Sequence, residues 1–123
     1  MDKRLLGRYG EALAAEHLRK KGYTVLGMNF RTRLGEIDVV ASDRTYMVFV
    51  EVKLRRDDSF APAREFVTRS KQQKVMAASQ EWLIKHPSEL QPRFDVIEIY
   101  APEGITTASP VIRHWENAYG ADG

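Results

Sequence analysis

The sequence predicts one mixed α/β domain, in which helices flank a mixed β-sheet. Two proline-free segments with helical signals enclose three short apolar segments of strand character, and a fourth such segment follows the second helix. A chain of 123 residues usually forms one compact domain, which buries roughly two-thirds of its extended surface. No repeat or linker divides the chain, so we expect a single domain over residues 1–123.

The first helix is predicted over residues 3–21, since this segment contains no proline and Gly22 is a typical stop signal. Two stripes at helical spacing compete for the face that packs on the sheet. The stripe of small residues carries one charge, Glu11, which it would bring toward the sheet; the competing stripe leaves this assignment open. The first stripe contains Gly7, Glu11, Ala14, Ala15, Leu18 and Gly22, and the second contains Leu5, Tyr9, Ala12, Leu13 and Glu16.

Three strands are predicted next, at residues 23–30, 35–41 and 45–54. The second and third of these, GEIDVVA and TYMVFVEVKL, flank a polar turn at residues 42–45, which is typical of a β-hairpin. Because the connections are short, we expect the three strands to form an antiparallel meander.

A loop and a second helix follow the hairpin. Residues 55–67 are polar and predict a loop, and Ser70 with Gln73 fits a capping box that opens a helix. This helix is predicted to reach Lys85, since Pro87 follows.

The last strands are predicted at residues 93–100 and, as a short edge strand, at residues 111–115. A helix joins the third and fourth strands, which favours a parallel crossover between them. The sheet should therefore be mixed.

Composition excludes several classes of protein. There is no cysteine, so neither a disulfide framework nor a thiolate zinc site can form. No apolar stretch approaches the roughly 20 residues of a membrane span, and the opening residues do not look like a signal peptide. We expect a soluble, cytoplasmic protein without a membrane partner.

Charge is distributed unevenly along the chain. Residues 1–74 contain 16 basic and 10 acidic residues, whereas residues 75–123 contain 3 basic and 7 acidic ones. A basic part of this kind indicates a polyanion such as nucleic acid as a partner, although an ordinary solvated surface also clusters charge.

The hairpin gathers charged residues on one strand face. Alternation places Glu51 and Lys53 on the same face as Phe49. A two-residue turn at residues 43–44 would make Asp38 and Glu51 diagonal neighbours, about 7–8 Å apart between backbones. If a bulge raised the sum of the paired residue numbers by two, Asp38 would lie directly opposite Glu51. In both registers the two carboxylates share a face with Lys53.

Two neighbouring carboxylates raise each other's pKa unless a cation is present. Hard oxygen ligands of this kind suit Mg²⁺ or Mn²⁺, and Lys53 would stand close enough to touch water or phosphate at such an ion. A metal site beside a lysine indicates a phosphodiester substrate. The competing interpretations are a cross-strand salt bridge for Glu51 and Lys53, and an ordinary surface acid for Glu11.

Five motifs in this order resemble the YraN-like family, uncharacterised small bacterial proteins placed among the restriction-endonuclease-like PD-(D/E)xK nucleases, to which archaeal Holliday junction resolvases also belong. The resemblance covers residues 7–119 and implies a restriction-endonuclease-like mixed β-sheet flanked by helices, in the order α-β-β-β-α-β with a short terminal strand. The motifs are Gly7-x-x-x-Glu11, GEID at 35–38, FVEVK at 49–53, RSKQQK at 69–74 and RFDV at 93–96.

The resemblance implies a metal-dependent nuclease of DNA repair or recombination, with Mg²⁺ as cofactor and Mn²⁺ as a substitute. Its acidic motif falls on Asp38, its Glu-x-Lys on Glu51 and Lys53, and its helical acid on Glu11. Asp38, Glu51 and the Val52 carbonyl would hold the metal, with Glu11 helping directly or through water.

The partner implied is nucleic acid, with DNA favoured over RNA. Resolvase relatives act as dimers, so a homodimer and a repair or recombination partner protein both stay open. The basic and polar residues expected to contact nucleic acid are Arg31, Arg33, Arg55, Lys71, Gln72 and Lys74.

Two departures from the family pattern concern the substrate loop, with Phe60-Ala61-Pro62 where glycine is common, and Leu54, where threonine is frequent. Two other classes remain as alternatives. One is a nucleic-acid-binding module that keeps the nuclease fold but does not cut, and the other is a protein-interaction domain that uses the acidic C-terminal part.

Three other features are expected to be structural. Asp95 should be a hydrogen-bond partner, and Trp82 should belong to the core. The three histidines show no ligand spacing, so no chemistry is assigned to them.

Overall fold

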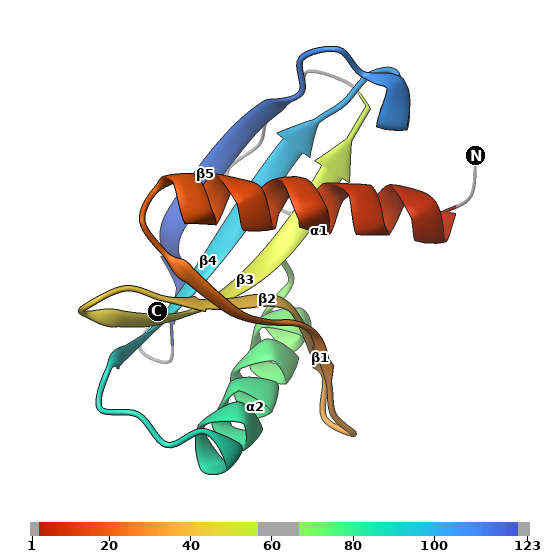
Figure 1. The fold of residues 1–123 in the computed structure, drawn as a ribbon. Coiled ribbons are helices and arrows are strands. Elements are labelled where there is room, and N and C mark those ends of the chain that lie inside the picture. Colours follow the sequence, from red (N-terminus) through yellow and green to blue (C-terminus); the bar gives the residue numbers. More distant parts are fainter. Residues whose placement is uncertain (1–2, 57–66, 121–123) are drawn as a thin grey trace.

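The chain forms a five-stranded sheet with a helix on each face (Figure 1). This computed structural model describes residues 3–56 and 67–120. Within these residues, no helix is long and apolar enough to span a bilayer. In chain order the elements are α1 (Lys3–Lys20), β1 (Thr24–Arg31), β2 (Glu36–Ser42), β3 (Tyr46–Arg55), α2 (Arg69–Lys85), β4 (Gln91–Tyr100), the 3-10 helix η2 (Gly104–Thr106) and β5 (Val111–Tyr119).

The strand order is β1-β2-β3-β4-β5. The pairs β1–β2 and β2–β3 are antiparallel, β3 and β4 are parallel, and β5 closes the sheet antiparallel to β4. The predicted mixed sheet is confirmed, because β3 and β4, which are joined through α2, pair in parallel.

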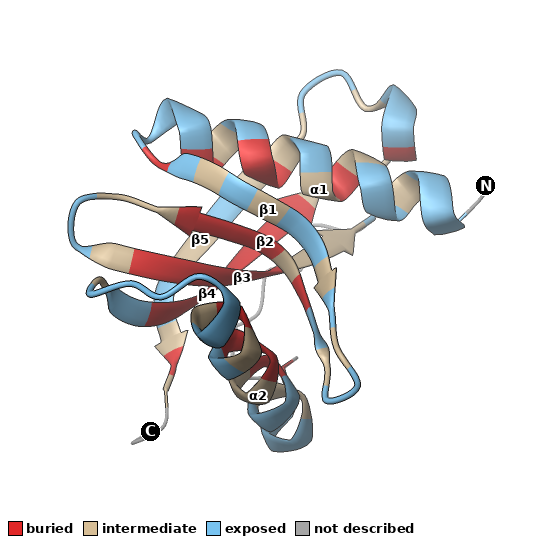
Figure 2. Ribbon diagram, turned by 60° about the horizontal axis from the view of Figure 1, so that its bottom comes forward, coloured by how far each residue is buried: buried red, intermediate tan, exposed pale blue. Residues whose placement is uncertain are grey.

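Each helix covers a different face of the sheet (Figures 1 and 2). The face under α1 is built from the aliphatic residues of β2, β3 and β4 with Ala14 and Leu18 of the helix. The face under α2 contains the aromatic residues Phe49 and Phe94, packed with Val75 and Trp82 of the helix. The core position predicted for Trp82 is confirmed. Burial of both apolar faces supplies most of the driving force for folding.

The small-residue stripe of α1 is the one that faces the sheet. Ala14 and Leu18 are fully buried, whereas Leu5 of the competing stripe is 46% exposed. Gly10 lies so close to β3 that a Cβ there would meet the side chains of Leu54 at 3.5 Å and Val52 at 3.6 Å. Small residues therefore bring α1, and Glu11 with it, close to the end of β3.

The hairpin turn lies one residue later than predicted. The turn residues are Arg44 and Thr45, since the Asp43 amide donates to the Tyr46 carbonyl at 3.1 Å. The Asp43 carboxylate fixes this turn by accepting from the amides of Thr45 and Tyr46, at 2.8 and 2.7 Å. The prediction of a two-residue turn at residues 43–44 was therefore wrong.

The shifted turn sets the register of the hairpin. Val39 pairs with Val50, and Ser42 pairs with Met47. Extending this register by one residue sets Asp38 opposite Glu51, which is the closer of the two arrangements that the sequence allowed. This register needs no bulge, because the turn lies one residue later than predicted.

The start of α2 also differs from the prediction. Thr68, not Ser70, is the N-cap: its backbone is extended, and its hydroxyl accepts from the Lys71 amide at 3.2 Å. The Gln72 side chain donates to the Val67 carbonyl at 2.9 Å. The prediction of a capping box at Ser70 and Gln73 was wrong, because the helix begins at Arg69. Most of the predicted loop at residues 55–67, including Phe60-Ala61-Pro62, lies outside the described residues.

The terminal strand is longer than predicted, since β5 runs to Tyr119 and not to residue 115. A bulge between Phe94 and Val96 keeps it paired, with Asn117 in the left-handed region at φ 51°. Tyr119 stacks on Phe94, with ring centroids 5.5 Å apart. This aromatic contact holds the end of β5 in the sheet. The polar residues 116 and 117 interrupt the strand pattern, so the sequence did not predict this end.

A buried polar network joins β4, β5 and the connection before β1. Arg93 donates to both carboxylate oxygens of Asp95, at 2.9 and 2.8 Å, and to the Tyr23 hydroxyl at 2.6 Å. His114 Nε2 lies 2.7 Å from Asp95 Oδ2. Burial works to raise the pKa of Asp95, but hydrogen bonds from His114, Arg93 and the Asn117 amide outweigh it and hold the pKa below its ordinary value. The hydrogen-bonding role predicted for Asp95 is confirmed.

We expect Asp95→Asn to lower the free energy of unfolding by about 3–5 kcal/mol, because it removes the buried counter-charge of the Arg93 guanidinium and leaves only the exposed Glu116 carboxylate, at 4.0 Å. Urea denaturation at pH 7 measures this change. Glu16→Gln is the control: it breaks the exposed Lys20–Glu16 pair and should change stability by less than about 0.5 kcal/mol. An Asp95→Asn protein as stable as the wild type would contradict the role given to the network.

Candidate active site

The predicted acidic residues and lysines meet at one cavity. It has a volume of about 220 Å³ and lies where α1 and the start of α2 approach the hairpin. Four elements contribute to it, so residues far apart in the sequence become neighbours. The lining residues are Gly7, Gly10, Glu11, Glu36, Asp38, Glu51, Val52, Lys53, Leu54 and Lys71.

Asp38 and Glu51 form the acidic centre of the cavity. The Val52 amide donates to Asp38 Oδ2 at 2.8 Å, which fixes the carboxylate beside Glu51. Glu51 itself is buried, with 4% of its surface exposed. Burial, and then the charge of Glu51, raise the pKa of Asp38 to about 7, although the Val52 hydrogen bond opposes the rise. Asp38 can therefore gain or lose a proton near neutral pH.

Two lysines flank Glu51. Lys71 Nζ lies 2.6 Å from Glu51 Oε1, and Lys53 Nζ lies 3.9 Å from the same oxygen. Burial, and then the charge of Lys71, lower the pKa of Lys53. Burial works to lower the pKa of Lys71 too, but the hydrogen bond and charge of Glu51 outweigh it and raise the pKa. The two lysines therefore differ: the pKa of Lys71 is raised by Glu51, and the pKa of Lys53 is lowered by burial and by Lys71.

Glu11 reaches the cavity from α1 but has another partner. The Asn29 side-chain amide donates to Glu11 Oε1 at 3.0 Å. Asn29 lies in the left-handed region at φ 54°, which asparagine tolerates better than most residues. Glu36, which also lines the cavity, forms an exposed ion pair with Arg31 at 3.2 Å.

The donor set of the cavity suits a hard cation that keeps much of its water. Among residues 3–56 and 67–120, no three His, Cys, Asp or Glu side chains are grouped closely enough to hold a metal by themselves. Mg²⁺ is commonly bound through one or two carboxylates with water completing its octahedron. Asp38 and Glu51 fit that requirement, and a divalent cation between them would remove the repulsion that raises the pKa of Asp38.

The residues expected to contact nucleic acid fall into two groups. Arg31, Lys71 and Lys74 line cavities beside the acidic centre, and Arg33 is exposed in the β1–β2 turn. The other two are held by the fold. Arg55 Nε donates to the buried Glu98 carboxylate at 2.7 Å, and Gln72 donates to the backbone before α2.

Some lining residues were missed by the sequence reasoning. Arg4, Arg8 and Asn29 line a cavity of about 570 Å³ that also contains Glu11 and Arg31. The spacing of Arg4, Arg8 and Glu11, at i, i+4 and i+7, could have revealed that they share a helix face.

The fold and the cavity define a class of protein: a mixed α/β domain with two adjoining carboxylates and two lysines at one end of its central strands. The model of the uncharacterised protein family UPF0102 matches residues 10–99. The chain belongs to this family, so the YraN-like assignment is confirmed.

Relatives within the family extend over nearly the whole chain. A UPF0102 protein of Caldanaerobacter subterraneus subsp. tengcongensis is 40% identical over 121 residues, which are 97% of this chain and 98% of the relative. A UPF0102 protein of Alkaliphilus oremlandii is 40% identical over 117 residues, covering 93% and 97% of the two chains. A UPF0102 protein of Caldicellulosiruptor saccharolyticus is 41% identical over 101 residues, covering 81% and 86%.

The raised pKa of Asp38 predicts a pH-dependent gain in stability for Asp38→Asn. Between the ordinary pKa of 3.8 and about 7, the unfolded chain ionises Asp38 while the folded protein keeps it protonated, so wild-type stability falls as the pH rises. The variant should therefore melt at a higher temperature than the wild type at pH 8, in EDTA, and lose this advantage at pH 4.

Thermal melting followed by circular dichroism measures this difference. Asp43→Asn is the control, because hydrogen bonds from Tyr46 and Thr45 lower the pKa of Asp43, so it should gain nothing at pH 8. An Asp38→Asn protein without a gain at pH 8 would contradict the shifted pKa.

Proposed function

We propose that this protein is a metal-dependent nuclease that hydrolyses phosphodiester bonds, with DNA favoured as its substrate. The observation that carries the proposal is the cavity in which Asp38 and Glu51 adjoin beside Lys53 and Lys71. A fold gains little stability from two adjoining carboxylates of which one, Glu51, is buried, so this arrangement is better explained by chemistry.

Asp38, Glu51 and the Val52 carbonyl would hold Mg²⁺, or Mn²⁺ in its place, with Glu11 assisting through water. When bound, the ion would lower the pKa of a water molecule and neutralise charge on the phosphate. The Val52 amide contributes by fixing the Asp38 carboxylate in the cavity.

The two lysines have different roles in this proposal. Lys53, which lies 3.9 Å from Glu51, orients the attacking water or stabilises the charge on the phosphate in the transition state. Lys71, whose pKa is raised, remains an ammonium group and binds a phosphate oxygen when it leaves Glu51. The negative charge on the five-coordinate phosphorus of the transition state is thereby balanced by groups already in place.

Cationic residues on both sides of the cavity support a polyanionic substrate. Arg31 lies on the β1 side and Lys74 on the α2 side. We further propose a cytoplasmic role in repair or recombination, in which a homodimer or a partner protein would place a second active site on the other strand.

A second candidate is a nucleic-acid-binding module that does not cut. It is favoured by the 2.6 Å contact between Lys71 and Glu51, which neutralises Glu51 without a metal. The two candidates differ in whether Mg²⁺ or Mn²⁺ displaces Lys71.

We expect Glu51→Gln and Asp38→Asn each to reduce cleavage by about 100-fold or more, since removal of a metal ligand costs at least as much as loss of its supporting residues. The measurement is the cleavage of labelled single-stranded, duplex, flap and four-way-junction DNA with Mg²⁺ and with Mn²⁺. Glu89→Gln, an exposed carboxylate before β4, is the matched control and should cut like the wild type. Wild-type cleavage by Glu51→Gln would contradict the mechanism.

Lys71→Met separates the two candidates. If Lys71 competes with a metal for Glu51, this variant should bind Mn²⁺ about tenfold more tightly than the wild type, the scale of one supporting interaction at a metal site. Isothermal titration with Mn²⁺ in the absence of DNA measures the change. Lys20→Met, at an exposed position of α1, is the control. Undetectable Mn²⁺ binding by both Lys71→Met and the wild type would favour the non-cutting module.

A further inference from the structure

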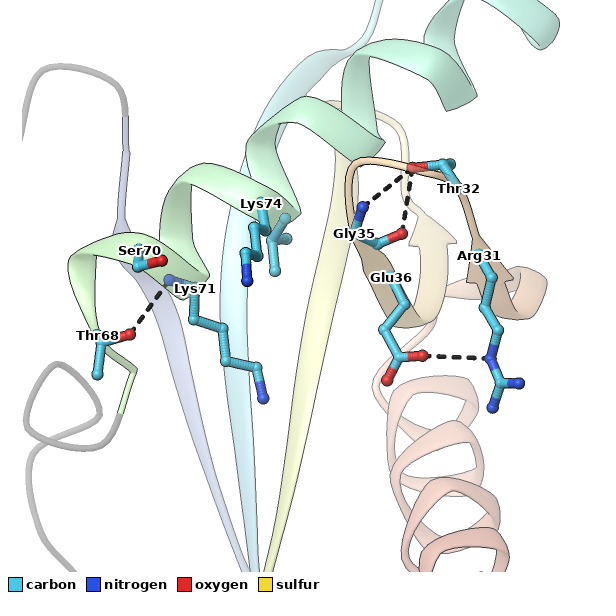
Figure 3. Close-up of a pocket in the computed structure, with 9 residues that line it drawn as sticks. Arg31, Thr32, Gly35, Glu36, Thr68, Ser70, Lys71 and Lys74 are labelled. Atoms are coloured by element: carbon cyan, nitrogen blue, oxygen red, sulfur yellow. Dashed lines mark hydrogen bonds and ion pairs between the residues drawn. The ribbon is translucent and has the colours of Figure 1, made fainter.

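A second cavity lies directly beside the candidate active site (Figure 3). We call it the turn–helix cavity, because it lies between the β1–β2 turn and the start of α2. It has a volume of about 410 Å³. Its lining residues are Arg31, Thr32, Gly35, Glu36, Thr68, Ser70, Lys71, Lys74 and Val75.

The walls of the turn–helix cavity are fixed relative to each other. Thr32 closes the turn: its amide donates to the Gly35 carbonyl at 2.8 Å, and its hydroxyl accepts from the amides of Leu34 and Gly35. Gly35 packs so closely on α2 that a Cβ there would lie 2.5 Å from the Lys74 carbonyl oxygen. The turn is therefore held against the helix, and the space between them is a built feature of the fold.

The lining of this cavity combines cations, hydroxyls and an apolar floor. Figure 3 shows Lys71 and Lys74 reaching from α2 on one side, with the Arg31–Glu36 pair on the other. The charge of Glu36 is offset by Arg31, at 3.2 Å, and that of Lys71 by Glu51, at 2.6 Å, so Lys74 makes the cavity cationic. Val75, with 2% of its surface exposed, lies at the apolar part. A ligand that matches this lining carries an anionic group and an apolar ring.

The cavity is continuous with the candidate active site through shared residues. Lys71 and Glu36 line both cavities, so a chain whose phosphate lies at Asp38 and Glu51 would pass its next nucleotide into the turn–helix cavity. A volume of about 410 Å³ falls at the lower end of the range for small-ligand pockets, about 300–1,000 Å³. A cavity at this end of the range suits a ligand of about the size of one nucleotide.

We infer that the turn–helix cavity binds one unpaired nucleotide of single-stranded DNA, adjacent to the phosphate that the proposed nuclease cuts. This inference rests on the proposed function and specifies its substrate class. Lys74 contacts the backbone phosphate of that nucleotide, and its base lies over Val75. A strand that is already single pays the least unstacking cost to place a nucleotide in such a cavity.

The test measures binding by fluorescence anisotropy, in EDTA so that no cleavage occurs. The probes are a labelled oligothymidine of about eight nucleotides, within the site sizes of about 4–16 known for single-strand binders, and a blunt duplex of equal length. Ser70→Tyr fills the cavity from the exposed start of α2, and Lys74→Ala removes the phosphate contact. Lys20→Ala removes an exposed charge outside the cavity and is the matched control. Melting temperatures verify that each variant folds.

We expect the wild type to bind the single strand more tightly than the duplex. Ser70→Tyr should weaken single-strand binding by about fivefold or more, the scale of one lost base contact. Lys74→Ala should lower the slope of log affinity against log salt by about 0.7, as expected for one lost phosphate contact on a single strand. Lys20→Ala should leave both quantities unchanged.

Failure of this inference differs from failure of the proposed function. If the wild type cuts DNA with Mg²⁺ but both cavity variants bind the single strand as it does, or if the duplex binds as tightly as the single strand, the inference is wrong and the nuclease stands. If the wild type neither binds nor cuts any DNA, the proposed function is wrong, and the inference falls with it.

Discussion

The repulsion between two adjoining carboxylates is the constraint on which the site depends. Asp38 and Glu51 meet because the β2–β3 register sets them opposite each other, at the point where apolar strands give way to charged residues. Burial, and then the charge of Glu51, raise the pKa of Asp38, and Lys71 lies 2.6 Å from Glu51. In the structure the lysine supplies the positive charge beside this carboxylate pair.

The rest of the fold serves to hold this pair in place. Aliphatic and aromatic residues on the two sheet faces bind α1 and α2 to opposite sides. The small-residue face of α1 packs on the sheet and brings Glu11 to the cavity, and Thr68 starts α2 where Lys71 can reach Glu51. Asp95 pairs with Val50, and its neighbour Val96 pairs with Glu51, so the buried network around Asp95 braces β4 directly beside the site.

Much of the fold, and part of the site, could be predicted from the sequence. Strand alternation placed Glu51 with Lys53, and the helix between the third and fourth strands predicted the parallel pair. The hairpin register could not be decided, because it depends on hydrogen bonds from two amides to Asp43. The contact of Lys71 with Glu51 depends on where α2 begins. The helix is capped by Thr68, two residues before the predicted cap Ser70, so its start was not predicted correctly. Long-range pairs such as Arg55 with Glu98 leave no local signal.

The most direct test of the account is a crystal of the protein soaked in MnCl₂ and measured at a wavelength where manganese scatters anomalously. We expect an anomalous peak between the carboxylates of Asp38 and Glu51, with Lys71 withdrawn from Glu51. An empty site at high Mn²⁺, with Lys71 still paired to Glu51, would contradict the claim that these carboxylates were brought together to hold a metal.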